Sequence, residues 1–137
     1  MTTFISYSGT ASQIDVPSAI QDVTITAIPA DFVKGNAAAT YVRIPDSVTS
    51  IASGAFSNCA ALKTIVIGSG VTSIDATAFQ SLTAFEGCYY KGTPTQWAAL
   101  NFTTFGDSVA YYSETTPTDT EHYYWHYDTD NLTPVMY

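Results

Sequence analysis

Two histidines four residues apart, His122 and His126, have the spacing in this sequence that most resembles a metal site. On a helix, this spacing would place both imidazoles on one face, where they could bind one ion. The surrounding run HYYWHY is aromatic and alternates as a strand does. Four positions along a strand separate the two rings by roughly 13 Å, which is too far to share an ion. We therefore expect no metal at this pair.

Carboxylates offer two further candidates for chemistry. Asp75 and Glu86 could pair in a cleft, which is the arrangement that hydrolysis would need. The segment DTDN at 128–131 resembles the start of a calcium loop, but the glycine and the distal glutamate are absent, which favours a solvated turn. No serine-hydrolase, phosphate-loop, dinucleotide-binding or zinc-protease motif occurs. We predict a non-enzymatic protein with no catalytic residue, metal site or cofactor.

The two cysteines, Cys59 and Cys88, are 29 positions apart and form no CxxC pair. Each occupies an apolar position of the repeat described below. The sequence therefore predicts two reduced, buried thiols.

Charge and composition restrict the partners and the location. The net charge is −8, and the four basic residues are scattered, so nucleic acid and anionic membrane surfaces would be repelled. No apolar stretch is long enough to cross a membrane, and residues 1–13 do not resemble a signal peptide. Few charges and many Ser, Thr and Tyr are typical of β-rich proteins on the outside of cells or particles. We expect an extracellular, cell-surface or virion-exterior location, reached by assembly, by lysis, after removal of a leader, or as a fragment of a longer protein.

The elements that would position these residues follow from an internal repeat. Residues 41–63 align with 64–86 at eight identities in 23 positions, and the apolar columns continue in degraded form to residue 105. Within one unit, LKTIVI alternates as a strand does, with Ile65 and Ile67 facing inward. The following segment, 49–62, has apolar residues at spacings of three and four, which predicts one or two helical turns.

One such unit cannot bury its own apolar face, so each must stack on the next and pair its strand in parallel. The sequence predicts an α/β solenoid of about four coils of 23 residues with β-rich terminal caps. We expect one domain, 1–137, with an N-terminal cap and irregular first coil at 1–40, repeats at 41–105 and a C-terminal cap at 106–137. The segment TFISY would seal the first coil.

The pattern IPxxVxxIxxxAFxxCxxLxxIxI closely resembles the BspA-type leucine-rich repeat. It is carried here by Ile44, Pro45, Val48, Ile51, Ala55, Phe56, Cys59, Leu62, Ile65 and Ile67. The aromatic tail resembles the closing segment of such repeats in surface proteins of gut bacteria, and similar small proteins accompany the phages of those bacteria. The resemblance implies a non-catalytic interaction or attachment module, and it names no ligand.

Two sets of residues are candidates for partner binding. Strand alternation places Tyr41, Thr64 and Gly87 in one column of the open face of the sheet, and Arg43, Val66 and Tyr89 in the next. Such residue types are favoured at interfaces, although an ordinary solvated sheet is the alternative. In the tail, Tyr123, Trp125 and Tyr127 would share a face. They would either cover the last coil or form a platform for sugar rings or a protein.

The predicted partner is therefore a protein, either a host-surface or a virion component, with a glycan as the alternative. The predicted function is an interaction or attachment module displayed outside a cell or phage particle. The alternative is a structural accessory protein of the decoration, tail or head-fibre type, docked on a virion lattice. A homo-oligomer would favour this alternative, and a monomer would favour the free-standing module.

Overall fold

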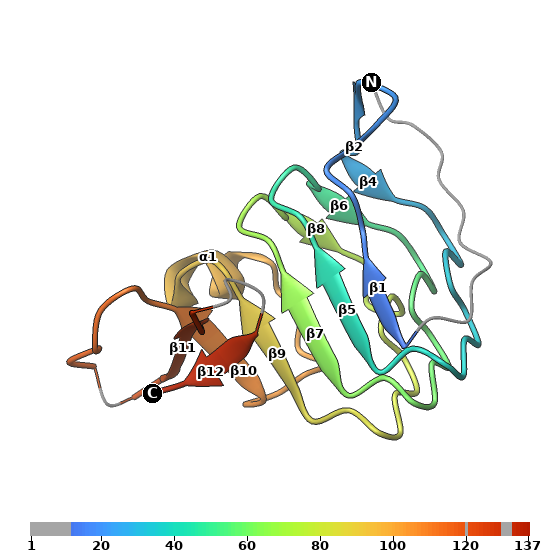
Figure 1. Ribbon diagram of the computed structural model, residues 1–137. Helices are drawn as coiled ribbons and strands as arrows, with labels where there is room; N and C mark the ends of the chain where they lie inside the picture. Colours follow the sequence, from blue (N-terminus) through green and yellow to red (C-terminus); the bar gives the residue numbers. More distant parts are fainter. Residues whose placement is uncertain (1–11, 120, 130–132) are drawn as a thin grey trace.

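A computed structural model describes residues 12–119, 121–129 and 133–137, and Figure 1 shows their arrangement. The predicted seal TFISY and part of the segment DTDN lie outside the described residues. A seven-stranded sheet has the order β1-β5-β7-β9-β10-β11-β12, in which all pairings are parallel except that of β12 with β11. The strands are β1 (Gln13–Asp15), β5 (Tyr41–Ile44), β7 (Thr64–Ile67), β9 (Gly87–Tyr90), β10 (Val109–Tyr112), β11 (Tyr123–Tyr127) and β12 (Pro134–Met136).

Smaller strands form the other sides of the coils. The strands β4 (Ala27–Ile28), β6 (Ser50–Ile51) and β8 (Ser73–Ile74) pair in parallel in a narrow second sheet. A hairpin of β2 (Ala19–Ile20) and β3 (Val23–Thr24) projects from the first coil. In the large sheet, Tyr41 pairs with Thr64 and Thr64 with Gly87, so neighbouring strands are one repeat apart. These registers confirm the predicted solenoid of 23-residue coils.

A column of phenylalanine rings runs through the core from coil to coil. Phe56 and Phe79 are both fully buried, and their rings stack with centroids 5.1 Å apart and planes inclined by 5°. Phe32 contacts Phe56 edge-on at 6.0 Å, and Phe102 contacts Phe79 in the same way. Because equivalent residues contact each other in successive coils, each coil buries the apolar face of the next.

The helical turns predicted at 49–62 are wrong. After β6 the chain makes hydrogen-bonded turns, and two of its backbone donors bond to the next coil instead of within their own. The Phe56 N–H donates to the Ala78 carbonyl at 2.7 Å, and the Asn58 N–H donates to that of Gln80 at 2.9 Å. An α-helix would need these donors for hydrogen bonds within the coil. Because they bond to the stacked coil instead, no helix forms here.

One helix, α1 (Pro94–Ala99), occurs among the described residues, in the degraded fourth unit. Thr93 caps it by accepting a hydrogen bond from the Gln96 N–H, and the Gln96 side chain accepts one from the Thr93 N–H. This reciprocal capping box and the proline at its start favour a helix here. Trp97 is buried against Tyr90, at 5.0 Å between centroids, and so extends the core past the exact repeats.

Candidate functional site

The strand registers bring most of the predicted contact residues onto one face of the large sheet, which we call the open face. One row across the strands consists of Gln13, Tyr41, Thr64 and Gly87. The next row consists of Asp15, Arg43, Val66, Tyr89, Ala110 and Tyr123. The two candidate sets of the sequence, from the repeats and from the tail, therefore lie on one continuous surface.

Two predicted contact residues, Val66 and Trp125, are not accessible to a partner, since both are 0% exposed. They lie in a second apolar cluster with Ala110, on the opposite side of the sheet from the main core. Trp125 belongs to β11, and its Nε1–H donates a hydrogen bond to the backbone carbonyl of Tyr90 on β9, at 3.0 Å. The small side chain of Ala110 on the intervening strand β10 leaves room for the indole. The tail therefore covers part of the open face.

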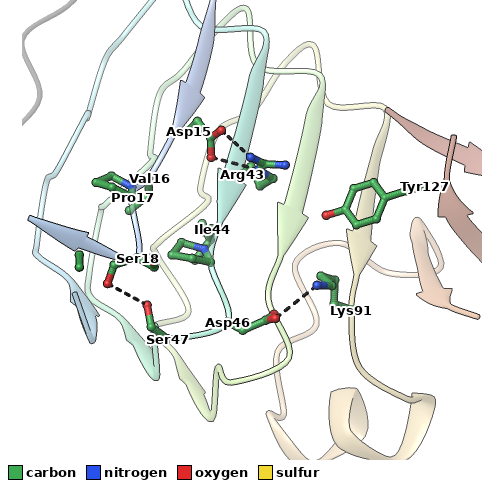
Figure 2. Close-up of a pocket in the computed structure, with 12 residues that line it drawn as sticks. Asp15, Val16, Pro17, Ser18, Arg43, Ile44, Asp46, Ser47, Lys91 and Tyr127 are labelled. Atoms are coloured by element: carbon green, nitrogen blue, oxygen red, sulfur yellow. Dashed lines mark hydrogen bonds and ion pairs between the residues drawn. The ribbon is translucent and has the colours of Figure 1, made fainter. Parts of the chain in front are cut away.

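The exposed remainder of the open face contains two adjoining hollows that share Asp15 and Arg43, and we call them together the open-face groove. The first has a volume of about 680 Å³ at the carboxyl ends of β1 and β5, and Tyr127 reaches into it from β11 (Figure 2). The second, of about 530 Å³, is lined by Tyr41, Thr64 and Tyr89, with Pro134 of β12 at its margin.

Two ion pairs fix the charged side chains of the groove. Arg43 donates to Asp15 through Nε at 3.0 Å and through Nη2 at 2.6 Å, and this paired geometry raises the pKa of the guanidinium, against the effect of its partial burial. Lys91 donates to Asp46 at 3.2 Å (Figure 2). Partial burial alone would raise the pKa of Asp46, but the hydrogen bond from the Ser69 N–H and the Lys91 ammonium outweigh it and lower that pKa.

Two tyrosine rings lie close to Lys91, and one of them, Tyr127, lines the groove. The Lys91 ammonium lies 5.9 Å from the ring centroid of Tyr112 and 5.8 Å from that of Tyr127, within the range of cation–π attraction. The groove thus presents two compensated charge pairs beside aromatic faces, held on strands and on the residues that directly follow them. Such fixed donors, acceptors and flat apolar surfaces suit the recognition of a partner.

Sequence reasoning missed three residues of this groove. Lys91 continues the column of Pro45 and Gly68, one repeat apart each, so the repeat alignment contained the signal for its position. Asp15 precedes the exact repeats, and its pairing with Arg43 spans 28 residues because the first coil is irregular. Asp46 reaches Lys91 across two coils, at a separation of 45 residues, and no local pattern predicts this contact.

The histidines of the tail have separate partners. His122 Nδ1 is 2.6 Å from the Asp119 carboxylate, whereas His126 Nδ1 is 2.8 Å from the Tyr127 carbonyl oxygen. The predicted strand at this run is confirmed as β11. Within the described ranges, no group of three or more His, Cys, Asp or Glu side chains is arranged to hold a metal ion.

The other candidate residues for chemistry are two carboxylates and two cysteines. Asp75 accepts two hydrogen bonds from Thr77, and Glu86 forms an ion pair with Lys63 at 3.5 Å. Each carboxylate therefore interacts with a residue other than the carboxylate considered as its partner. Cys59 and Cys88 are buried free thiols, as predicted, and burial raises the pKa of both. Among the residues that the structure describes, no helix has the length and apolar character to cross a bilayer.

Comparison with known proteins defines the class. The family described as BspA type leucine rich repeat region matches residues 26–105 in six copies. This match covers more than half of the chain, and the chain belongs to the BspA-type leucine-rich repeat family. The family is typical of surface proteins, and leucine-rich repeats generally form non-enzymatic modules that bind proteins.

One solved structure supports the fold. A leucine-rich repeat protein of T. pallidum, TpLRR, matches with a TM-score of 0.60 at 20% identity, over 78% of this chain and 50% of that chain. This chain therefore spans about half the length of TpLRR. A leucine-rich repeat protein from Bacteroides capillosus ATCC 29799 matches with a TM-score of 0.48 at 22% identity, over 74% of this chain and 77% of that one. No curated protein matches this chain.

Proposed function

We propose that this chain is a protein-interaction or attachment module that binds its partner in the open-face groove and is displayed outside a cell or phage particle. The observation that carries the proposal is the groove itself, where Arg43 and Lys91 are held by Asp15 and Asp46 beside Tyr127. The membership of a repeat family whose modules bind proteins is consistent with it.

The rigidity of the sheet supports binding at this surface. The parallel strands β1, β5, β7 and β9 satisfy each other's backbone groups, and the phenylalanine column packs behind them. Side chains on the open face are therefore presented at fixed spacing, and a partner would lose little free energy by ordering them. Tyrosine and arginine are the residue types that most often dominate the binding energy of protein interfaces.

Panning a random-peptide display library on the immobilised protein tests the groove. We expect peptides enriched on the wild type to be lost on Arg43→Ala and on Lys91→Ala, and to be retained on Gln80→Ala, a control in the exposed turn between β8 and β9. Equal enrichment on the wild type and both groove variants, or no enrichment at all, would contradict the proposal.

The groove variants should remain folded. The Arg43–Asp15 pair is partly solvent-exposed, with 26% of the Arg43 side chain and 60% of the Asp15 side chain accessible, and ion pairs open to solvent contribute about 0 to 1 kcal/mol. Urea unfolding should therefore show a change below about 1 kcal/mol for Arg43→Ala. A larger loss would assign the ion pair to stability instead of recognition.

A structural accessory role on a virion lattice is the second candidate. The observation that favours it is the edge strand β12, which exposes Val135 and Met136 and is followed by the exposed Tyr137. Light scattering after size-exclusion chromatography separates the two roles. A stable oligomer that dissociates on Val135→Lys would favour the accessory role, and a monomer would favour the free-standing module.

A further inference from the structure

The C-terminal part of the chain carries an uncompensated negative charge. Residues 92–137 contain six acidic residues and no lysine or arginine. All four basic side chains lie earlier in the sequence, and each forms an ion pair with a carboxylate. The net charge of −8 is therefore concentrated toward the strands β10 to β12.

Two hollows adjoin where this charge meets exposed aromatic surface. One, of about 490 Å³, is lined by Tyr89, Ala110 and Met136, with Glu86 at its margin. The other, of about 440 Å³, is lined by Tyr111, Glu121 and His122. Asp107, Val109 and Tyr123 line both hollows and so form the ridge between them. We call the two hollows together the acidic cleft.

The ridge carries an aromatic ring that the fold leaves in solvent. Tyr123 is 64% exposed, more than any other large apolar or aromatic side chain described, and Met136 across the first hollow is 42% exposed. The neighbours of Tyr123 on β11 differ in this respect, because Trp125 is buried and Tyr127 half-buried. The ring of Tyr123 is thus free to cover a ligand that enters either hollow.

Two carboxylates of the acidic cleft are available to a ligand. Asp107 is exposed and has no ion-pair partner among the described residues, and the same holds for the side chain of Glu121. Glu86 is weakly compensated by Lys63 at 3.5 Å. By contrast, the Asp119 carboxylate is occupied by His122 at 2.6 Å and by the hydroxyl of Tyr124 at 2.8 Å.

We propose that the acidic cleft binds a lysine or arginine side chain of a partner protein, with Asp107 and Glu121 facing the charge and Tyr123 covering the side chain. A cationic side chain fits both parts of this surface. Its apolar stem can pack on the tyrosine ring and the methionine, while its charged end meets the ring face and the carboxylates. Phosphate and acidic segments would be repelled by the same charge. This inference rests on the proposed function and specifies the chemistry of one contact beside the open-face groove, with which the acidic cleft shares Tyr89.

Amide chemical-shift perturbation by NMR tests the acidic cleft directly. The probes are a blocked lysine–glycine peptide and its glutamine–glycine and glutamate–glycine counterparts, titrated at low salt. The lysine peptide should shift amides at 107–110 and 121–123 and weaken as salt is added. Shifts confined to other residues, or equal binding of the glutamine peptide, would overturn the proposal.

Variants locate the interaction. Asp107→Asn should weaken the lysine peptide about two- to fivefold, the range of an exposed ion pair. Tyr123→Ala should weaken it to a similar extent, whereas Tyr123→Phe retains the ring and the affinity. The matched control is Asp22→Asn, which removes the same charge from the exposed turn of the distant β2–β3 hairpin. If Asp22→Asn weakens binding as much as Asp107→Asn, the attraction is only that of net charge and the proposal fails.

The proposals for the open-face groove and for the acidic cleft can be refuted separately. Arg43→Ala, which tests the groove, should leave the affinity for the lysine peptide unchanged. Conversely, Asp107→Asn should leave the selection of groove-dependent peptides unchanged. Loss of lysine-peptide binding in Arg43→Ala, with Asp107→Asn unaffected, would place the cation elsewhere and overturn the inference.

Discussion

Replacement of Phe79 by alanine tests the stacking of coils most directly. The ring is 1% exposed and contacts Phe56 at 5.1 Å, Phe105 at 5.1 Å and Phe102 at 6.0 Å between centroids. A buried phenylalanine replaced by alanine costs about 3 to 5 kcal/mol, from lost burial and from the cavity that remains. Because Phe79 has ring contacts on both sides, we expect a loss near the upper end, about 4 to 5 kcal/mol.

The stacked pair also makes a prediction about coupling. Phe56→Ala should cost about 3 to 5 kcal/mol by itself. The double variant should cost less than the sum of the single variants by about 0.5 to 1.5 kcal/mol, the coupling typical of aromatic pairs in contact. Strict additivity would mean that the rings contribute only by their separate burial.

Equilibrium unfolding in urea provides the assay, with circular dichroism and tryptophan fluorescence as two probes of the same transition. Phe79→Leu is the control that keeps the site apolar, and it should cost about 1 to 2 kcal/mol and remain measurable if the alanine variant is too unstable. A loss below about 1 kcal/mol for Phe79→Ala would refute the argument that packing between coils holds the solenoid together.

Three further predictions concern the tail and the thiols. Trp125→Phe removes the indole donor from a buried carbonyl and should cost about 1 to 3 kcal/mol in urea unfolding, which an unchanged midpoint would contradict. A hydrogen bond from the Glu121 N–H, with others from nearby side chains, lowers the pKa of Asp119 to about 2. The stabilisation from these bonds is therefore complete above the ordinary pKa of about 3.9 and is lost as pH falls through about 2, and an NMR titration of the carboxyl near 3.9 would contradict it. Cys59 and Cys88 are buried with raised pKa values, so a thiol reagent should react slowly with the native protein and rapidly in urea, and fast native reaction would contradict their burial.

The coil and its buried residues could be predicted from the sequence because the spacing of the repeat determines which residues pack together. When Ile44 and Ile67, or Phe56 and Phe79, recur at one spacing, a stacked strand and a shared core are the arrangement that buries both copies. The strands β5, β7 and β9 and the buried thiols follow from the same columns. Alternation along each strand also places Tyr41, Arg43 and Tyr89 on the open face.

The turns after β6 and β8 were beyond prediction because their cause lies in another coil. Apolar spacings of three and four fit a helix equally well, and the choice depends on where the backbone donors bond. The neighbouring coil supplies carbonyls at Ala78 and Gln80 that no local pattern reveals. A sequence window contains one coil at a time, whereas the hydrogen bonds join two.

The sequence by itself determined a chain of stacked coils with one polar and aromatic face, since repetition at a fixed period leaves the apolar columns no other way to be buried. Only the tertiary structure decided which part of that face stays open. β11 pairs with β10, the small Ala110 makes room, and Trp125 covers the sheet as far as the Tyr90 carbonyl. Arg43 and Tyr123 stay accessible on either side of this cluster. Whether a side chain is buried depends on which strand its segment pairs with. The pairing of β11 with β10 is a long-range contact, and the alternation of residues within β11 does not encode it.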